Sequence, residues 1–185
     1  MHNFPKIFYF VDSFNKEELK NLNKKIGIIY RNYKKVDFSE INRLRIFCKE
    51  HGKKLFLANN ASLAFRLRLN GVYIPSFNKN LRLCKYKNYN NFQIIGSAHN
   101  IKEIVIKKLQ GVKFLFIAPL FKTQKSQNFL EIYRFKILKK IAKLQTFALG
   151  GINKKNIKRI KLTECYGFAS ISYIKNNITQ RKIKH

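Results

Sequence analysis

Eight short apolar segments recur along the chain, and longer amphipathic stretches separate them. Each segment has at most eight residues, is rich in Ile, Phe, Val and Tyr, and is mostly continuous instead of alternating with polar residues. Continuous runs of this kind are typical of strands that are buried on both faces of a parallel sheet. The segments are 6–12, 25–31, 54–60, 71–76, 92–99, 114–120, 146–151 and 167–172.

The stretches between these segments carry signals for helices. Side chains that can cap a helix N-terminus stand at the start of four of them, at Asn15, Ser39, Asn100 and Asn153. The stretch 129–143 has the spacing of an amphipathic helix, with a predicted apolar face made of Leu130, Tyr133, Ile137, Leu138 and Ile141. Each predicted strand is thus followed by a helix or at least by a connection.

Strands that alternate with helices form βαβ units and a parallel sheet, and eight such units are the number found in a closed (β/α)8 barrel. We therefore expect an α/β fold, a compact (β/α)8 TIM barrel over residues 1–185 as a single domain, with a core over about 5–175 and a basic C-terminal tail. A doubly wound open sheet is the competing arrangement. Because such barrels typically have ~250 residues, a chain of 185 must have short loops.

The net charge narrows the class of partner. The chain has 39 Lys and Arg against 9 Asp and Glu, a formal charge of +30, and a basic surface attracts nucleic acid, anionic lipid or phosphorylated metabolites. The lysines are spread over every predicted helix and no nucleic-acid recognition motif is present, which suits nonspecific adhesion better than sequence readout. A basic nucleic-acid-binding protein remains an alternative class.

Other features predict a cytoplasmic protein without a membrane segment. The longest apolar runs, such as 114–121, are less than half of the ~18–20 residues that a membrane-spanning helix needs. The three cysteines have no close spacing, which argues against a disulfide framework or a cysteine-rich zinc site and fits a reducing compartment.

Polar residues or glycines follow most of the predicted strands, and in this fold the active site forms at the C-terminal ends of the strands. Ordinary polar turns explain part of this pattern. The most informative pair is Gly150-Gly151, because two glycines at a strand end let backbone N–H groups approach an anion. Phosphate sites in such barrels often use the loops after strands seven and eight, and Ser172 ends the eighth run. A tight left-handed turn is the alternative reason for the glycines.

Several segments resemble, in sequence order, motifs of the thiamine phosphate synthase/TenI family. Ala-Leu-Gly-Gly-Ile-Asn at 148–153 is similar to its Ala-(Ile/Leu)-Gly-Gly-Ile loop, and Ile-Ala-Pro-Leu-Phe-Lys-Thr at 117–123 resembles its Gly-Pro-(Val/Ile)-Phe-Pro-Thr strand end. Segments 30–31, 58–60, 71–74, 95–99 and 167–172 resemble further strands of the family. The resemblance covers nearly the whole chain, and its weight comes from the ordered series of motifs.

The resemblance implies a (β/α)8 barrel that couples an aminopyrimidine pyrophosphate to a thiazole phosphate with Mg²⁺ and releases pyrophosphate. Its partners are therefore phosphorylated heterocyclic small molecules. The catalytic residues that the resemblance implies are Arg31, Ser97 and Lys125. The implied substrate- and phosphate-binding residues are Asn59, Thr123, Gly150, Gly151, Ile171 and Ser172.

The chain departs from the family where the family binds metal. Asn60 and Asn78 stand in place of its two metal-binding carboxylates, and Mg²⁺ prefers charged oxygen ligands, so we expect no protein-held metal. Lys122 replaces a proline of the family motif. Two interpretations follow: a barrel that binds a phosphorylated heterocycle without metal-assisted displacement, or an enzyme in which Lys35 or Lys79 supplies the missing positive charge.

Overall fold

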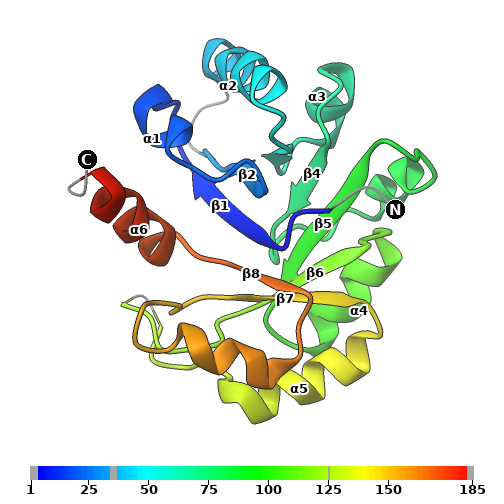
Figure 1. Cartoon of the computed structure of the whole chain (residues 1–185). Coiled ribbons are helices and arrows are strands. Elements are labelled where there is room, and N and C mark those ends of the chain that lie inside the picture. The colour runs from blue at the N-terminus through cyan, green and yellow to red at the C-terminus, as the bar shows by residue number, and fades with distance from the viewer. Residues whose placement is uncertain (1–3, 34–36, 125, 183–185) are drawn as a thin grey trace.

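Eight parallel strands close into a barrel in the computed structural model, which describes residues 4–33, 37–124 and 126–182 (Figure 1). Each strand pairs with the next one in sequence, and β8 pairs with β1. The strands are β1 Ile7–Val11, β2 Ile26–Tyr30, β3 Leu55–Ala58, β4 Gly71–Ile74, β5 Gln93–Ala98, β6 Phe114–Ile117, β7 Gln145–Leu149 and β8 Gly167–Ala169. The predicted (β/α)8 TIM barrel is confirmed, and the open sheet is excluded. The strands stop one to three residues before the ends of the predicted runs.

Helices surround this barrel, with short 3₁₀ helices after β4 and β7 in place of full α-helices (Figure 1). They are α1 Lys16–Lys20, α2 Phe38–Glu50, α3 Ala61–Arg66, η1 Leu81–Tyr86, α4 Ile101–Leu109, α5 Glu131–Ala142, η2 Ile157–Thr163 and α6 Ser172–Lys182. Ile178 of α6 is buried, so the packed part of the chain extends beyond residue 175. No helix of the described chain is long and apolar enough to cross a bilayer.

Two of the four predicted helix caps are confirmed. The side chains of Asn15 and Asn100 accept hydrogen bonds from backbone N–H groups in the first turns of α1 and α4. The cap of α2 is Asp37 instead of Ser39, since the Asp37 carboxylate accepts the N–H of the third helical residue. Asn153 does not begin a helix, because its side chain accepts the N–H of Lys155 in a turn, and Asn156 is the residue that precedes η2.

The predicted apolar face of α5 is mostly wrong. The residues that pack on the barrel are Phe135, Leu138 and Ala142, whereas Tyr133 is 77% exposed and Ile137 is also exposed. Positions 135, 138 and 142 share one helix face, and the apolar residues four apart lie on another. The helix therefore carries two apolar faces, and the barrel covers one of them.

Aromatic rings fill the interior of the barrel. Phe8 is fully buried, and its ring centroid lies 5.5 Å from that of Phe56 and 5.4 Å from those of Phe116 and Phe147. Below them, the ring of Phe4 stacks on a further phenylalanine at the N-terminal end of the barrel. Since the interior is packed, a ligand site on the barrel axis must be built on the loops at the other end.

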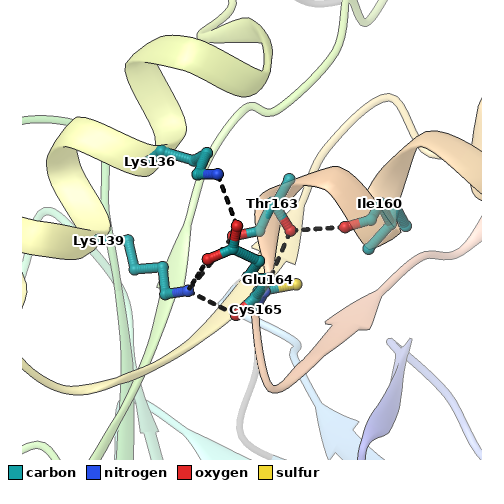
Figure 2. Close-up of polar contacts among 6 residues, drawn as sticks. All are labelled: Lys136, Lys139, Ile160, Thr163, Glu164 and Cys165. Atoms are coloured by element: carbon teal, nitrogen blue, oxygen red, sulfur yellow. Dashed lines mark hydrogen bonds and ion pairs between the residues drawn. The ribbon is translucent and has the colours of Figure 1, made fainter.

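A polar cluster joins α5 to the turn that leads into β8 (Figure 2). The ammonium of Lys136 lies 2.6 Å from the carboxylate of Glu164, and Lys139 donates to the backbone carbonyl of Glu164 at 2.6 Å. The hydroxyl of Thr163 donates to the carbonyl of Ile160 at 2.7 Å. Exposed ion pairs add little stability, so the main effect of this cluster is to orient the start of β8 against the neighbouring helix.

Candidate functional site

A cavity of about 920 Å³ opens at the C-terminal ends of the strands. It lies between the loops that follow β2, β5, β6, β7 and β8, and Phe10 of β1 also lines it. The structure brings six of the predicted site residues to its lining: Arg31, Thr123, Gly150, Gly151, Ile171 and Ser172. These residues come from four different loops, which meet only because the sheet closes on itself. Of the other three, Ser97 and Asn59 do not line the cavity, and Lys125 is not among the described residues.

Both glycines after β7 have left-handed backbone conformations, with φ of 93° at Gly150 and 71° at Gly151. A Cβ atom on Gly150 would lie 2.7 Å from a side-chain carbon of Pro119, and one on Gly151 would meet the carbonyl oxygen of Phe121. The N–H of Phe121 donates to the carbonyl of Gly150 at 3.1 Å. The turn that needs glycine is thus present, and it presses the β7 loop against the β6 loop.

Free backbone donors from the β7 and β8 loops line the same cavity. Within the described residues, the N–H groups of Gly151, Ile171 and Ser172 donate to no other protein group. The buried hydroxyl of Ser170 donates to the carbonyl of Ile152 at 2.9 Å and so joins the two loops. Ser172 is also the first residue of α6, where the helix dipole favours an anion. This arrangement is suited to hold a phosphate group.

The charged side chains on the cavity wall are basic. Arg31, Lys122 and Arg134 line it, and no carboxylate does so among the described residues. The Arg31 guanidinium carbon lies 4.8 Å from the ring centroid of Phe10, a distance that favours cation–π attraction. Sequence reasoning missed Lys122, Arg134 and Ser170 as parts of the site. The only signal for Lys122 was its place inside the strand-end motif.

The side chains of two predicted residues, Ser97 and Thr123, take part in hydrogen bonds within the protein. Ser97 is 4% exposed, does not line the cavity, and accepts a hydrogen bond from the hydroxyl of Tyr73 at 2.9 Å inside the barrel. Burial of Tyr73 raises its pKa. Thr123 lines the cavity, and its hydroxyl oxygen accepts the N–H of Ser126 at 3.0 Å. Lys125 lies outside the described residues.

The asparagines at the family's metal positions are already hydrogen-bonded and do not line the cavity. The side-chain oxygen of Asn59 accepts the amide of Asn78 at 2.7 Å. The side-chain oxygen of Asn78 accepts the N–H of Asn80 at 2.8 Å. The side-chain oxygen of Asn60 accepts the N–H of Leu63 at 3.0 Å as the cap of α3. The side-chain oxygens that a metal would need therefore already accept hydrogen bonds from N–H groups of the protein.

This donor set does not fit Mg²⁺. The ion prefers oxygens, including carboxylates, in octahedral geometry, and neutral amides that accept hydrogen bonds offer neither charge nor a free lone pair in that direction. The part of the chain that the structure describes contains no group of three His, Cys, Asp or Glu placed to hold a metal. Of the two lysines considered as substitutes, Lys79 is exposed and does not line the cavity, and Lys35 lies outside the described residues.

A buried lysine holds the loop after β4 instead. The Lys107 ammonium is fully buried and donates to the carbonyl of Asn78 at 2.7 Å and to the side chain of Gln110 at 2.9 Å. Gln110 donates to the same carbonyl at 3.0 Å. Burial lowers the pKa of Lys107 to about 8, against an opposing effect of nearby Glu103. These hydrogen bonds hold the loop after β4 against the C-terminal end of α4.

Comparison of sequences relates this chain to thiamine phosphate synthases. The family model for thiamine monophosphate synthase matches residues 22–174. The chain is 32% identical over 126 residues to a thiamine-phosphate synthase of Prochlorococcus marinus, covering 66% of this chain and 36% of that protein. It is 26% identical over 160 residues to the putative thiamine-phosphate synthase 2 of Aquifex aeolicus, covering 83% and 85%.

Two of the similar synthases are longer than this chain. It spans 36% of the Prochlorococcus protein and 64% of a similar thiamine-phosphate synthase from Clostridioides difficile. Among solved structures, a thiamine phosphate pyrophosphorylase from Pyrococcus furiosus has a TM-score of 0.73 at 18% identity, covering 98% of this chain and 96% of that one, a likeness of fold. Because the family model spans every strand end that forms the cavity except that of β1, this chain belongs to the thiamine monophosphate synthase family.

Proposed function

We propose that this chain binds a thiazole phosphate in the cavity and couples it to an aminopyrimidine pyrophosphate. The reaction is an alkyl transfer, in which a carbon of the pyrimidine substrate exchanges its bond to pyrophosphate oxygen for a bond to the thiazole nitrogen, and pyrophosphate leaves. The observation that carries this proposal is the convergence of the free N–H groups of Gly151, Ile171 and Ser172 on one side of a cavity without carboxylates. Those donors are suited to the thiazole phosphate.

The cations of the cavity take the second role in this proposal. A departing pyrophosphate carries several negative charges, and preorganised positive groups stabilise such charge as it develops. Arg31, Lys122 and Arg134 line the cavity and supply positive charge without a metal ligand set. Lys125 follows Thr123 in the same loop and is proposed to act with them. We derive no step through Mg²⁺, because Asn60 and Asn78 do not fit it.

A pair of substitutions at Ser172 tests the phosphate site. Ser172→Pro removes the N–H donor at the first position of α6, where proline is well tolerated, and Ser172→Ala keeps the N–H and removes only the hydroxyl. In calorimetry we expect the proline variant to bind thiazole phosphate at least about tenfold more weakly and the alanine variant to bind it nearly as the parent does. Equal affinity in all three proteins would remove the assignment. A substitution at Gly151 is less informative, because its Cβ would meet the carbonyl of Phe121.

An assay with both substrates, with Mg²⁺ and with EDTA, tests catalysis. We expect product formation that depends little on Mg²⁺, because the amide oxygens of Asn59, Asn60 and Asn78 are engaged by N–H donors. Normal turnover that EDTA abolishes would contradict this expectation.

Asn60 and Asn78, which stand in place of the family's metal-binding carboxylates, also favour a second candidate function. This candidate is a barrel that binds a phosphorylated ligand and no longer catalyses the transfer. Its signature is tight binding of thiazole phosphate without product under either metal condition. A nucleic-acid-binding protein, the third candidate, would instead show affinity for nucleic acid that falls steeply with salt yet stays tight at physiological ionic strength. A cytoplasmic location remains a prediction from the sequence.

A further inference from the structure

Two neighbouring helices carry apolar side chains on their exposed surfaces. On each helix three such residues recur at every fourth position, and their exposed fractions run from 37% to 77%. We call this set the α4–α5 patch: Ile101, Val105 and Leu109 of α4, with Tyr133, Ile137 and Ile141 of α5. None of them contributes to the cavity described above.

The two stripes form one surface. Helices α4 and α5 pack side by side along the barrel (Figure 1). Ile104 and Lys107 define the buried face of α4, and Phe135 and Leu138 that of α5. At about 100° per residue, the α4 stripe lies on the flank of its helix that faces α5 in a right-handed β/α barrel, and the α5 stripe lies on the flank that faces α4. The patch is therefore continuous across the groove between the helices.

The charge around this surface is mainly positive. The most exposed charged residues of the two helices are all basic: Lys102, Lys108, Arg134, Lys136 and Lys140. The acidic residues Glu103 and Glu131 are half-buried, and Glu131 is paired with Arg159. Lys136 is paired with Glu164 on the far flank of α5. The remaining cations border an apolar centre, so any protein that covers the patch must bury apolar area against it.

We propose that the α4–α5 patch is a self-association surface, covered by a second copy of this chain about a two-fold axis. The exposed fractions of the six side chains correspond to roughly 600 Å² per copy, close to the roughly 800 Å² that each partner buries in a standard interface. This area is at the upper end of what the largest apolar patch of a monomer exposes, about 300–600 Å², and such patches are often functional. Side chains at i, i+4 spacing form a ridge along each helix, and a groove lies between the two helices. About a two-fold axis, the ridges of one copy can pack into the groove of the other.

The charge of the molecule predicts how this association depends on salt. Two copies that each carry +30 repel one another, and added salt screens that repulsion while leaving apolar burial intact. Self-association through the patch should therefore tighten as salt rises. An acidic partner protein docked on the same patch would show the opposite dependence.

Sedimentation velocity of the full chain over a concentration series tests the proposal. We expect a monomer–dimer equilibrium that shifts toward dimer between about 0.05 M and 0.5 M NaCl. The double variant Val105→Gln/Tyr133→Gln should weaken association at least about tenfold, since it removes apolar area at the centre of the patch. The control Ile46→Gln/Leu162→Gln changes two exposed apolar residues on other helices, 45% and 58% exposed, and should leave the association unchanged.

Two results would overturn the proposal. One is a wild-type protein that stays monomeric up to about 100 µM at both salt concentrations. The other is a dimer that the patch variant and the control weaken equally. Circular dichroism of each variant shows whether a lost dimer reflects a lost fold, and a folded monomeric patch variant supports the proposal. Neither outcome depends on the synthase function proposed above.

Discussion

Gly150 and Gly151 are required by the packing of their own loop before any ligand is considered. Both have positive φ, and each lies against the backbone or ring of the β6 loop, so no other residue fits there. The same turn leaves the N–H of Gly151 without a partner among the described residues. A conformation that favours glycine thus also leaves a free N–H donor at the cavity.

Lys122 offers the sharpest test of charge in the cavity. Its side chain lines the cavity next to the β7 loop, and the loss of a charge-assisted contact to phosphate costs about 1.5–3 kcal/mol. We therefore expect Lys122→Met to weaken binding of thiazole phosphate about tenfold or more in calorimetry. Lys49→Met removes the same charge from an exposed position on α2 and serves as the control. Equal weakening by both variants would show a general effect of net charge instead.

Lys107 links stability to pH. Burial lowers its pKa from 10.5 to about 8, so between these pH values the unfolded chain binds more protons than the folded one. Stability contributed by this group therefore rises with pH over that window. The free energy of unfolding of the wild type minus that of Lys107→Met should grow by up to about 3 kcal/mol from pH 7 to pH 10. Urea unfolding of both proteins at both pH values measures this difference. A difference that does not change with pH would contradict a lowered pKa of Lys107.

Sequence reasoning selected cavity residues whose N–H groups are placed by the backbone, and it missed cavity residues that are placed by tertiary packing. Gly151 and Ser172 were predicted because a strand end and a glycine pair determine where N–H groups lie. Ser97 also follows from strand position, but the alternation of β5 turns it into the barrel, where Tyr73 binds it. Ser170 donates to a carbonyl 18 residues earlier in the chain, and no local sequence pattern indicates this contact.

The β7 and β8 loops act as one unit because Ser170 connects them. Ser170→Ala would leave the carbonyl of Ile152 without its donor, so we expect the free energy of unfolding to fall by about 1–3 kcal/mol. Thiazole phosphate should also bind several-fold more weakly, because the two sets of donors would no longer be held together.

Ser13→Ala is the control for this change. Ser13 is exposed, and among the described residues its hydroxyl makes only a long contact of 3.4 Å to Asp12. Its loss should leave both quantities unchanged. If Ser170→Ala lowers stability and leaves the affinity for thiazole phosphate unchanged, the hydrogen bond between the two loops does not contribute to phosphate binding.

Strands were easier to predict than helices in this chain, and the physical reason is burial. A strand covered on both faces needs a continuous apolar run, and all eight runs contain a strand. A helix needs only one apolar face, and α5 has two, so periodicity alone selected Tyr133 and Ile137 over Phe135. The α2 cap shows a similar limit, since both Asp37 and Ser39 are capping residue types and only the tertiary path of the chain decides between them.

At the scale of the whole molecule, closure of the sheet creates the site. Pairing of β8 with β1 brings the loop after β8 beside Phe10 and Arg31, which come from the first two strands. The count of strands predicted this closure, because eight βα units complete a ring. The positive charge of the chain suits a cavity for anions, and its excess on the α4 and α5 surfaces also predicts salt-dependent association.

The central claim is that the free amides after β7 and β8 hold a phosphate group. Amide chemical shifts of the ¹⁵N-labelled protein, followed by NMR during titration with thiazole phosphate, report on those groups directly. The account predicts that the N–H signals of Gly151, Ile171 and Ser172 shift most, and that Ser172→Pro abolishes the shifts at the other two. Saturable binding that leaves these three signals in place and moves others would contradict it.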